Sequence, residues 1–274
     1  MNNLQRELAP VSAAAWAEIE KEAARTLKTT LAARKLVDFS GPHGVAVSAV
    51  GTGRTRTVAA PSQSGIEARL RAALPLVELR VPFELARAEL DAVERGAKDP
   101  DLDALIAAAQ AIAKAEDHAV FHGYAAAGIR GICEAAPGKP VSITDNYEDY
   151  PLAVAAALTR LRAGGVDGPY AIALGQQCYT GLTETTKGGY PVIQHVRRLV
   201  DGPIVWAPAV EGAVVLSTRG GDFELSVGQD FSLGYLDHGK DAVRLYIQES
   251  FTFQPLSPQA AVPLVYGAKA AKRR

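Results

Sequence analysis

The sequence has few of the residues that mark secreted, membrane or nucleic-acid-binding proteins. Only 2 cysteines occur in 274 residues, so no disulfide framework exists and a reducing cytoplasm is expected. No apolar run approaches the ~20 residues that a membrane helix requires, and the first ten residues lack the apolar segment of a signal peptide. The formal net charge of −1 gives no general attraction to nucleic acid or to anionic lipid. We therefore expect a cytoplasmic globular protein without nucleic-acid or membrane partners.

Complete catalytic and metal-binding motifs are also missing. His118 and His122 are four residues apart, yet Ala119 stands where a metal-hydrolase helix carries its glutamate. Cys178 has no nucleophile-elbow context, so a buried, inert thiol is the simpler interpretation. The acidic run from Asp99 to Asp103 lacks the glycine and final glutamate of a calcium loop, and it predicts a helix start. We predict no catalytic residue, metal or cofactor; a metal- or thiol-dependent hydrolase stays an alternative.

The first third of the sequence predicts a helix followed by a protruding arm. Ser12 is a candidate N-cap, and apolar residues recur at helical spacing from Trp16 to Leu31. Between Gly44 and Pro82, short alternating runs are broken by glycine and proline, with little large apolar side chain. Because an isolated hairpin is marginal in water, this arm must lie on another surface or be disordered. Its arginines lack interleaved aromatic residues, which favours contacts between subunits over nucleic acid.

The remaining pattern is mixed α and β. A strand is predicted at 76–85, and the longest helix at 100–129, with Leu102, Ile106, Ala109, Ala113 and Val120 on one face. Further helices are predicted at 151–163 and 192–199, and strands at 170–174, 203–207, 213–218, 223–227 and 242–253. The last strand alternates so that one face is buried and the other partly wet. The chain is therefore expected to be an α+β protein.

The run from Arg219 to Tyr235 (RGGDFELSVGQDFSLGY) resembles a signature segment of the encapsulin shell proteins. Four other segments agree in the same order: LQRELAP at 4–10, RKLVDFSGPHG at 34–44, AEDHAVFHG at 115–123 and AVRLYIQESFTF at 242–253. The resemblance spans residues 4 to about 266. It implies an HK97 phage capsid-like fold with a peripheral domain, an axial domain and an extended loop that lies across a neighbouring subunit.

The resemblance also implies domain boundaries. The expected segments are residues 1–43 (N-terminal helix and start of the peripheral domain), 44–82 (extended loop), 83–130 (peripheral domain with the spine helix), 131–221 (axial domain), 222–266 (return strands of the peripheral domain) and 267–274 (mobile basic tail).

The implied function is a self-assembling icosahedral nanocompartment that is not itself an enzyme. Its shell would have the smallest triangulation number (T=1, sixty copies), with pores that admit small solutes. It would enclose a cargo enzyme, such as a dye-decolourising peroxidase or a ferritin-like protein, docked on the inner wall by a short targeting peptide. The alternative is a phage or prophage major capsid protein of the same fold.

Two sites follow from the resemblance. The cargo-peptide dock would be an apolar groove for alternate Leu or Ile side chains, with polar contacts from Arg34 and Asp38. Its residues are Leu27, Leu31, Arg34, Leu36, Asp38, Phe231, Leu233 and Tyr235. From the residues alone, ordinary core and an internal Arg34–Asp38 salt bridge remain open.

The second site is a loop around the five-fold pore, at Thr186, Lys187, Gly188, Gly189 and Tyr190. Glycines would let the backbone approach the axis, and Lys187, repeated around that axis, would attract anions. Some relatives carry an aromatic residue associated with flavin at the position of Arg87, so no flavin is expected here.

Overall fold

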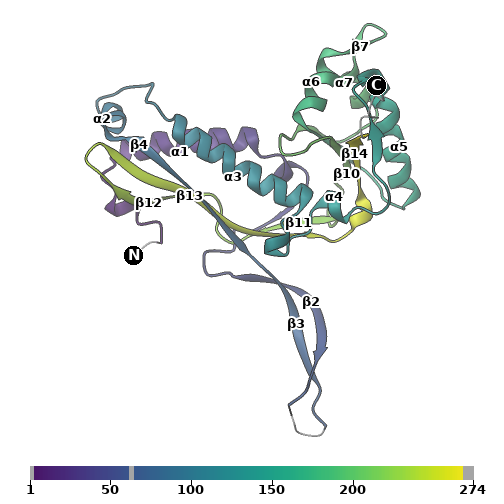
Figure 1. The fold of residues 1–274 in the computed structure, drawn as a ribbon, viewed down its shortest axis with the longest axis horizontal. Coiled ribbons are helices and arrows are strands. Elements are labelled where there is room, and N and C mark those ends of the chain that lie inside the picture. The colour runs from purple at the N-terminus through teal and green to yellow at the C-terminus, as the bar shows by residue number, and fades with distance from the viewer. Residues whose placement is uncertain (1–2, 62–64, 268–274) are drawn as a thin grey trace, which may run out of the picture.

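The computed structural model describes residues 3–61 and 65–267 and shows two lobes with a long arm (Figure 1). The helices are α1 (Ala13–Thr30), α2 (Arg87–Glu94), α3 (Asp103–His122), α4 (Ile132–Ala135), α5 (Tyr150–Ala163), α6 (Gln176–Glu184) and α7 (Val192–Arg197), with short 3₁₀ turns at η1 (Arg6–Leu8), η2 (Ala33–Lys35), η3 (Ala125–Ala127), η4 (Tyr147–Asp149) and η5 (Pro258–Ala260). The strands are β1 (Asp38–Ser40), β2 (Ala49–Val58), β3 (Ala68–Pro75), β4 (Val77–Ala86), β5 (Val141–Ile143), β6 (Tyr170–Leu174), β7 (Thr186–Lys187), β8 (Tyr190–Pro191), β9 (Ile204–Trp206), β10 (Ala213–Ser217), β11 (Phe223–Val227), β12 (Ser232–His238), β13 (Ala242–Pro255) and β14 (Ala261–Tyr266).

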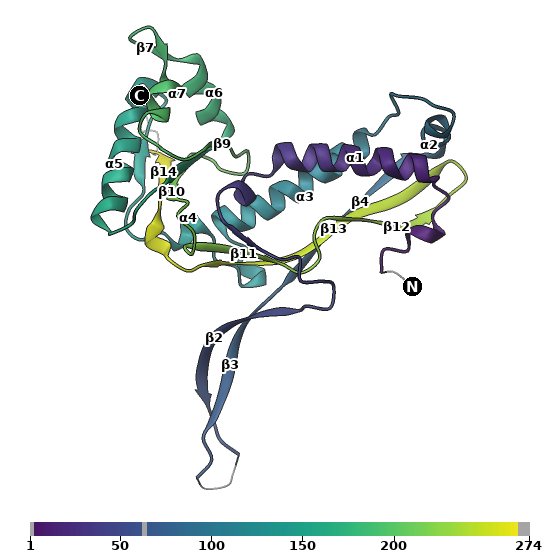
Figure 2. The same ribbon diagram turned by 180° about the vertical axis from the view of Figure 1, so that it is seen from behind.

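The first lobe consists of α1 and α3 packed on a sheet ordered β1-β11-β13-β12, with β4 on β13 as well (Figures 1 and 2). The Ser12 hydroxyl accepts a hydrogen bond from Ala15 N at 3.2 Å, so the predicted N-cap is confirmed. The apolar stripe of α1 is buried as its spacing predicts. It forms an α1–α3 core, whose larger members are Trp16, Ile19, Leu27, Leu31, Phe83, Leu85, Leu90, Leu102, Leu105, Ile112, Leu233, Tyr235, Val243, Leu245 and Ile247.

The second lobe is built on a sheet ordered β5-β14-β10-β6-β9, which contacts α5 and α6. Every residue of β6 and β10 is buried, as expected for strands covered on both faces. Gly175 joins β6 to α6, and a Cβ there would lie 2.0 Å from Val210 O, so this close approach requires glycine. The β6–β10 core includes Phe121, Ile132, Tyr150, Leu158, Leu161, Ile172, Leu174, Cys178, Val214, Leu216, Phe223, Phe251 and Phe253.

β13 belongs to both cores, because Ile247 lies in the α1–α3 core and Phe251 in the β6–β10 core. The predicted wet face of this strand is wrong at Tyr246 and Gln248, which are buried. Gly234 leaves room for the ring of Tyr246, since a Cβ at Gly234 would lie 2.1 Å from Tyr246 Cζ. Arg80 covers the same surface: its guanidinium lies 4.2 Å from the Tyr246 ring centroid and donates to Gln248 Oε1 at 2.7 Å.

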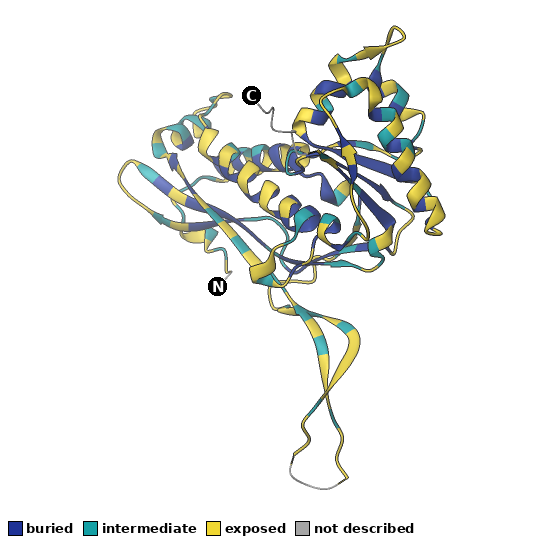
Figure 3. Cartoon of the chain, turned by 45° about the vertical axis from the view of Figure 1, so that its right-hand side comes forward, coloured by how far each residue is buried: buried dark blue, intermediate teal, exposed yellow. Residues whose placement is uncertain are grey.

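The arm is a two-stranded antiparallel hairpin of β2 and β3 that extends away from both lobes (Figure 3). Neither strand contains a buried residue, so its ladder lies outside both cores. The ordered hairpin replaces the alternative of a disordered arm over the described residues.

The longest helix is shorter than predicted, beginning at Asp103 and ending at His122 instead of near residue 129. Asp101 Oδ1 accepts from Asp103 N at 3.0 Å, so the acidic run is a helix start as predicted. Gly123 ends α3 with φ of 92°, and a Cβ there would lie 3.0 Å from Gly131 N. Helices α2 and α6 and strands β5 and β14 were not predicted.

Among the described residues, no helix combines the length and the apolar character needed to cross a bilayer. The predicted basic tail lies outside the described residues after Gly267.

Candidate functional site

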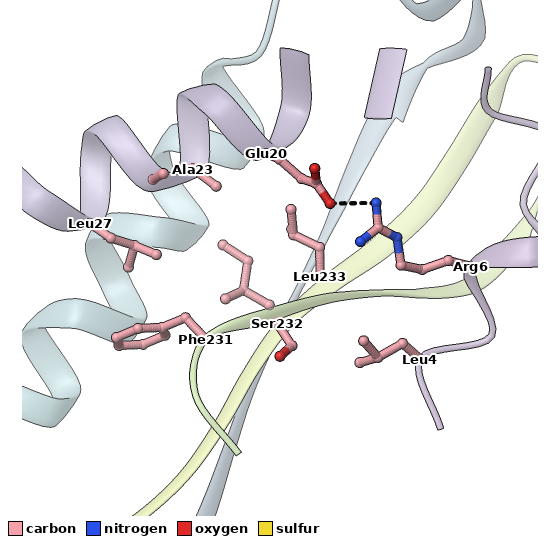
Figure 4. A pocket seen from close by; sticks show the side chains of 10 residues that line it. Leu4, Arg6, Glu20, Ala23, Leu27, Phe231, Ser232 and Leu233 are labelled. Carbon is pink, nitrogen blue, oxygen red and sulfur yellow. Dashed lines mark ion pairs between the residues drawn. The ribbon is translucent and has the colours of Figure 1, made fainter. Parts of the chain in front are cut away.

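A pocket of about 310 Å³ opens between α1, the N-terminal segment and β12 (Figure 4). Three predicted docking residues, Leu27, Phe231 and Leu233, line it together. Its lining is completed by Leu4, Arg6, Glu20, Ala23, Ala24, Ser232 and Ile247. Most of the lining side chains are apolar, which suits an extended peptide with apolar side chains.

The N-terminal segment forms one wall of this pocket, which the predicted set of docking residues does not include. Tyr235 N donates to Leu4 O at 2.9 Å, so the segment runs beside the outer edge of β12. Arg6 pairs with Glu20 at 2.6 Å across the pocket (Figure 4), and its guanidinium lies 4.1 Å from the Trp16 ring centroid. The only signal in the sequence for this wall was the LQRELAP segment of the resemblance.

A second, smaller pocket of about 140 Å³ contains two other predicted residues, Leu36 and Asp38. Asp38 is exposed and accepts a hydrogen bond from Gly221 N at 2.6 Å. The structure therefore divides the predicted dock between two hollows.

Arg34 lies between the two hollows. Its guanidinium is 4.5 Å from the ring centroid of Phe231, in the first pocket, and 5.0 Å from that of Phe39, which follows Asp38. Both distances fit cation–π contacts. The predicted set contained Phe231 but not Phe39, which carries no signal beyond its place in the RKLVDFSGPHG segment.

The hydrogen bonds of Arg34 point inward. Its Nη1 donates to Asp230 at 2.7 Å, and its Nη2 donates to Glu116 at 2.5 Å and Glu249 at 3.2 Å. Among the described residues Arg34 makes no ion pair with Asp38, so the alternative of an internal Arg34–Asp38 salt bridge is wrong. Burial would lower the pKa of Arg34, but the Glu116 and Asp230 carboxylates outweigh it and raise that pKa.

Leu31 and Tyr235 lie in the α1–α3 core, below the pocket surface. The Tyr235 hydroxyl is 2.5 Å from His238 Nδ1. Both residues therefore support the wall of the pocket instead of lining it.

The predicted pore loop is the tight β7–β8 hairpin at the outer tip of the second lobe (Figure 1). Gly188 and Gly189 form its turn with φ of 59° and 82°, values that favour glycine. The Lys187 ammonium donates to Glu148 O at 2.8 Å, so it is directed at its own chain. Tyr190 is 63% exposed at the tip.

The side chains of the hydrolase alternatives do not form an active site. His118 and His122 have ring centroids 5.1 Å apart, and His122 Nε2 lies 3.1 Å from Ala209 O. Across the residues described, no three His, Cys, Asp or Glu side chains are grouped to hold a metal. Cys178 is buried, the Tyr150 hydroxyl donates to its sulfur at 2.7 Å, and burial is the main cause that raises the pKa of its thiol.

Comparison with known proteins shows which family and which fold the chain resembles. The family model described as "Encapsulating protein for peroxidase" (Linocin_M18) matches residues 1–252. A "Type 1 encapsulin shell protein" from Rhodospirillum rubrum is 57% identical over 270 residues, covering 96% of each chain.

Two solved structures show the same fold at low sequence identity. A virus-like particle from Pyrococcus furiosus has a TM-score of 0.63 at 15% identity and covers 90% of this chain and 98% of its own. The capsid of Myoviridae phage XM1 has a TM-score of 0.53 at 10% identity and covers 84% of this chain and 90% of its own. These structures confirm the HK97 phage capsid-like fold.

Proposed function

The chain belongs to the family of encapsulating proteins for peroxidase, the encapsulin shell proteins, and we propose that it docks its cargo in the pocket between α1 and β12. It is a self-assembling shell protein with a capsid fold. The alternative of a phage capsid protein rests on the fold alone, since the phage capsid is only 10% identical.

The pocket beside β12 is the observation that carries the docking proposal. Its volume of about 310 Å³ is within the usual range for ligand sites, ~300–1,000 Å³. Leu27 and Leu233 provide apolar walls, and the Phe231 ring is held against Arg34 at one end. An extended peptide can lie beside residues 231–233, before the point where the N-terminal segment bonds Tyr235 N, and insert an apolar side chain between these walls.

The cargo that fits this proposal is a dye-decolourising peroxidase, because the family description names a peroxidase; a ferritin-like protein is the second candidate. The shell itself is not an enzyme, and its relatives are named as shell proteins. It is located in the cytoplasm as a T=1 particle. The β7–β8 hairpin surrounds a pore, where its backbone and Tyr190 face the solute path.

The domain assignment is part of the same proposal. The α1–α3 lobe is the peripheral domain, the β6–β10 lobe is the axial domain, and the hairpin of β2 and β3 is the extended loop that lies on a neighbouring copy. Exposed apolar side chains on the arm, Ile66 at 44% and Leu70 at 49%, support that contact, because a second chain would bury them.

The docking proposal is tested with a fluorescent protein fused to the C-terminal residues of a dye-decolourising peroxidase. This fusion is co-expressed with the wild-type chain, with Phe231→Ala, or with the control Leu152→Ala, whose side chain is 69% exposed on α5. Loss of an aromatic anchor weakens binding by about 2 kcal/mol or more, roughly 30-fold. Size-exclusion chromatography should show fluorescent particles for wild type and control, and empty particles of the same size for Phe231→Ala. Equal loading of all three would refute this dock.

A further inference from the structure

Three carboxyl groups surround the guanidinium of Arg34 just behind the proposed dock. Glu116 comes from α3, Glu249 from β13, and Asp230 from the turn before β12. The side chains of Glu116 and Glu249 are 0% exposed, whereas Arg34 is 16% and Asp230 is 40% exposed. Segments far apart in the sequence thus place one cation among three acids.

The charges of this cluster do not balance if every group is ionised. One guanidinium would face three carboxylates, two of them without access to water, and an uncompensated buried charge is costly. Glu116 and Glu249 both contact Nη2 of Arg34, so their like charges would also repel each other at short range. Two carboxyl groups so placed commonly share a single proton.

The hydrogen bonds point to the same conclusion. Within the described part of the chain, no N–H or hydroxyl group donates to the buried oxygen Oε1 of Glu249. Glu116 is the neighbouring carboxyl group, because both acids contact Nη2 of Arg34. A protonated carboxyl group can donate to the other carboxylate, whereas two carboxylates can only accept.

The charged groups next to the pair, Asp117 and Lys35, do not supply a second cation for Glu116 or Glu249. Asp117, adjacent to Glu116, accepts hydrogen bonds from Ala32 N and Ala33 N, each at 2.8 Å, and is therefore engaged at the start of η2. Burial is the main cause that raises the pKa of Asp117, to about 7, and Lys35 lowers that pKa in part. Arg34 is thus the only cation that contacts Glu116 or Glu249 among the described residues.

The cluster is connected to the dock through Arg34. The guanidinium lies between the rings of Phe231 and Phe39, so the groups that fix Arg34 also fix the aromatic end of the pocket. We propose that Glu116 and Glu249 share one proton and are positioning residues for cargo docking, because this proton holds Arg34 between the two rings. The link to docking rests on the proposed function.

The direction of the pH dependence follows from burial. Burial raises the pKa of Glu249 well above its ordinary value, and Glu116 raises it further by its charge, against the opposing effect of Arg34. The proton is therefore retained well above the ordinary pKa of a glutamate and is lost as the pH rises through the raised pKa. Loss of the proton leaves two buried carboxylates that repel each other on the same Nη2 of Arg34. The pair then separates and Arg34 is displaced from between the two rings, so docking weakens toward alkaline pH.

The experiment uses assembled wild-type shells and shells of Glu249→Gln, with Glu116→Gln as the second variant. Exposed Glu94→Gln on α2 is the matched control. Difference infrared spectroscopy detects the C=O stretch of a protonated buried carboxylic acid. All four shells contain Asp117, a second buried acid with a raised pKa, so the band of the pair is the one that differs between them. We expect this band in wild type and in Glu94→Gln, and its loss in Glu249→Gln and in Glu116→Gln, since either change removes one member of the pair.

Docking is measured in parallel as binding of the fluorescently labelled C-terminal peptide of a dye-decolourising peroxidase. Wild type and Glu94→Gln should bind about tenfold more weakly above the raised pKa of Glu249 than below it, as measured over a series of increasing pH values. Glu249→Gln imitates the protonated acid and should change less than about twofold over this range. If the role of Glu249 were purely structural, Glu249→Gln would bind the peptide with a different affinity at every pH but would keep the shape of the wild-type pH profile.

The two readouts separate the inference from the proposed function. Absence of the carboxylic acid band in wild type overturns the shared proton, whatever the peptide does. The band without peptide binding at any pH refutes the dock and, with it, the positioning role. If both glutamine variants fail to assemble, the band in wild-type shells and the wild-type binding profile still decide the inference: a pH-independent affinity overturns it.

Discussion

The arm and the central strand β13 are both antiparallel β-structure, but they are stabilised in opposite ways. In the arm, β2 and β3 pair only with each other, and neither contains a buried residue. β13 pairs with β4, β11 and β12 and contributes side chains to both cores. Backbone hydrogen bonds are present in both, so the difference lies in the apolar area that each element buries.

The difference in buried apolar area assigns β13 to the folding of a single chain and the arm to the assembly of several chains. A hydrogen-bonded ladder adds little net free energy by itself, because the unfolded chain bonds to water, and a lone hairpin is marginal. β13 is therefore expected to contribute to the stability of a single folded chain. The arm is expected to gain its stability only where it contacts another copy.

The largest expected effect is at Phe251, which is fully buried in β13. Phe251→Ala should lower the free energy of unfolding by about 3–5 kcal/mol, because it removes apolar contacts and leaves a cavity. Urea denaturation followed by tryptophan fluorescence measures this loss. The matched control is Val45→Ala near the base of the arm, where the side chain is 60% exposed. A loss below about 1 kcal/mol for Phe251→Ala would contradict the idea that burial of β13 stabilises the single chain.

The next effect concerns Asp117, which holds the turn after α1. Its pKa is raised to about 7, chiefly by burial, from an ordinary value of 3.8. The folded chain therefore binds more protons than the unfolded chain between these values, and the free energy of unfolding falls as the pH rises through that window. Asp117→Asn should remove this part of the slope, on the order of 4 kcal/mol. Urea unfolding at a series of pH values tests it, and an unchanged slope would contradict it.

Helix capping should have an intermediate effect. Ser12→Ala removes the acceptor for Ala15 N at the start of α1, and the free energy of unfolding should fall by about 1 kcal/mol. Ser12→Asp is the control, because an aspartate at the N-cap still accepts a hydrogen bond from the backbone. Equal losses for the two variants in thermal denaturation would indicate that the hydrogen bond is not the cause.

The ion pair that crosses the dock should matter less for stability. The side chains of Arg6 and Glu20 are 30% and 49% exposed, so solvent screens their attraction. Arg6→Ala should cost at most about 1 kcal/mol while removing one wall of the pocket. Arg25→Ala, which breaks an exposed pair with Glu22 on the same helix, is the control. If Arg6→Ala changes neither peptide binding nor stability relative to this control, the N-terminal wall has no role in docking.

The smallest expected effect on a single chain is in the arm. Leu70→Asp should change the free energy of unfolding of the dissociated chain by less than about 0.5 kcal/mol, because its side chain is 49% exposed. Assembly should nevertheless fail, since a charge would be buried against the neighbouring copy. Size-exclusion chromatography distinguishes particles from single chains, and Leu70→Val should assemble normally. Particles formed by Leu70→Asp would show that the arm surface at this residue is not an interface.

The sequence allowed the body of the fold to be predicted where periodicity was strong. The α1 stripe, its cap at Ser12 and strands β4, β6, β9, β10, β11 and β13 were predicted correctly because burial follows the spacing of apolar residues. Strands β1, β5, β12 and β14 of the same sheets were missed. Helix α6 was missed because its residues 176–184 are mostly polar or small and contain Gly181. The end of α3 was placed too late, because the backbone contact that stops it at Gly123 comes from residue 131.

The candidate site was predicted only in part. The prediction that one site contains Leu27, Phe231 and Leu233 came from the resemblance to a family. No local sequence pattern indicates that α1 contacts β12. The acids around Arg34 did leave a signal: Glu249 lies in the apolar register of β13, two residues from both Ile247 and Phe251. Such a glutamate is expected to be buried and therefore to need a partner, but its partner at Glu116 depends on tertiary packing.

The position of β13 in both cores also has a consequence for protein synthesis. β4, β11 and β12 all precede residues 242–255, and each lacks its antiparallel partner β13 until that segment has been made. Neither core can therefore close while the ribosome is still translating the first two hundred or so residues, and long-range pairing of this kind is intrinsically slow. The nascent chain must carry two open apolar surfaces until β13 emerges, which is the interval in which a chaperone would have the most to bind.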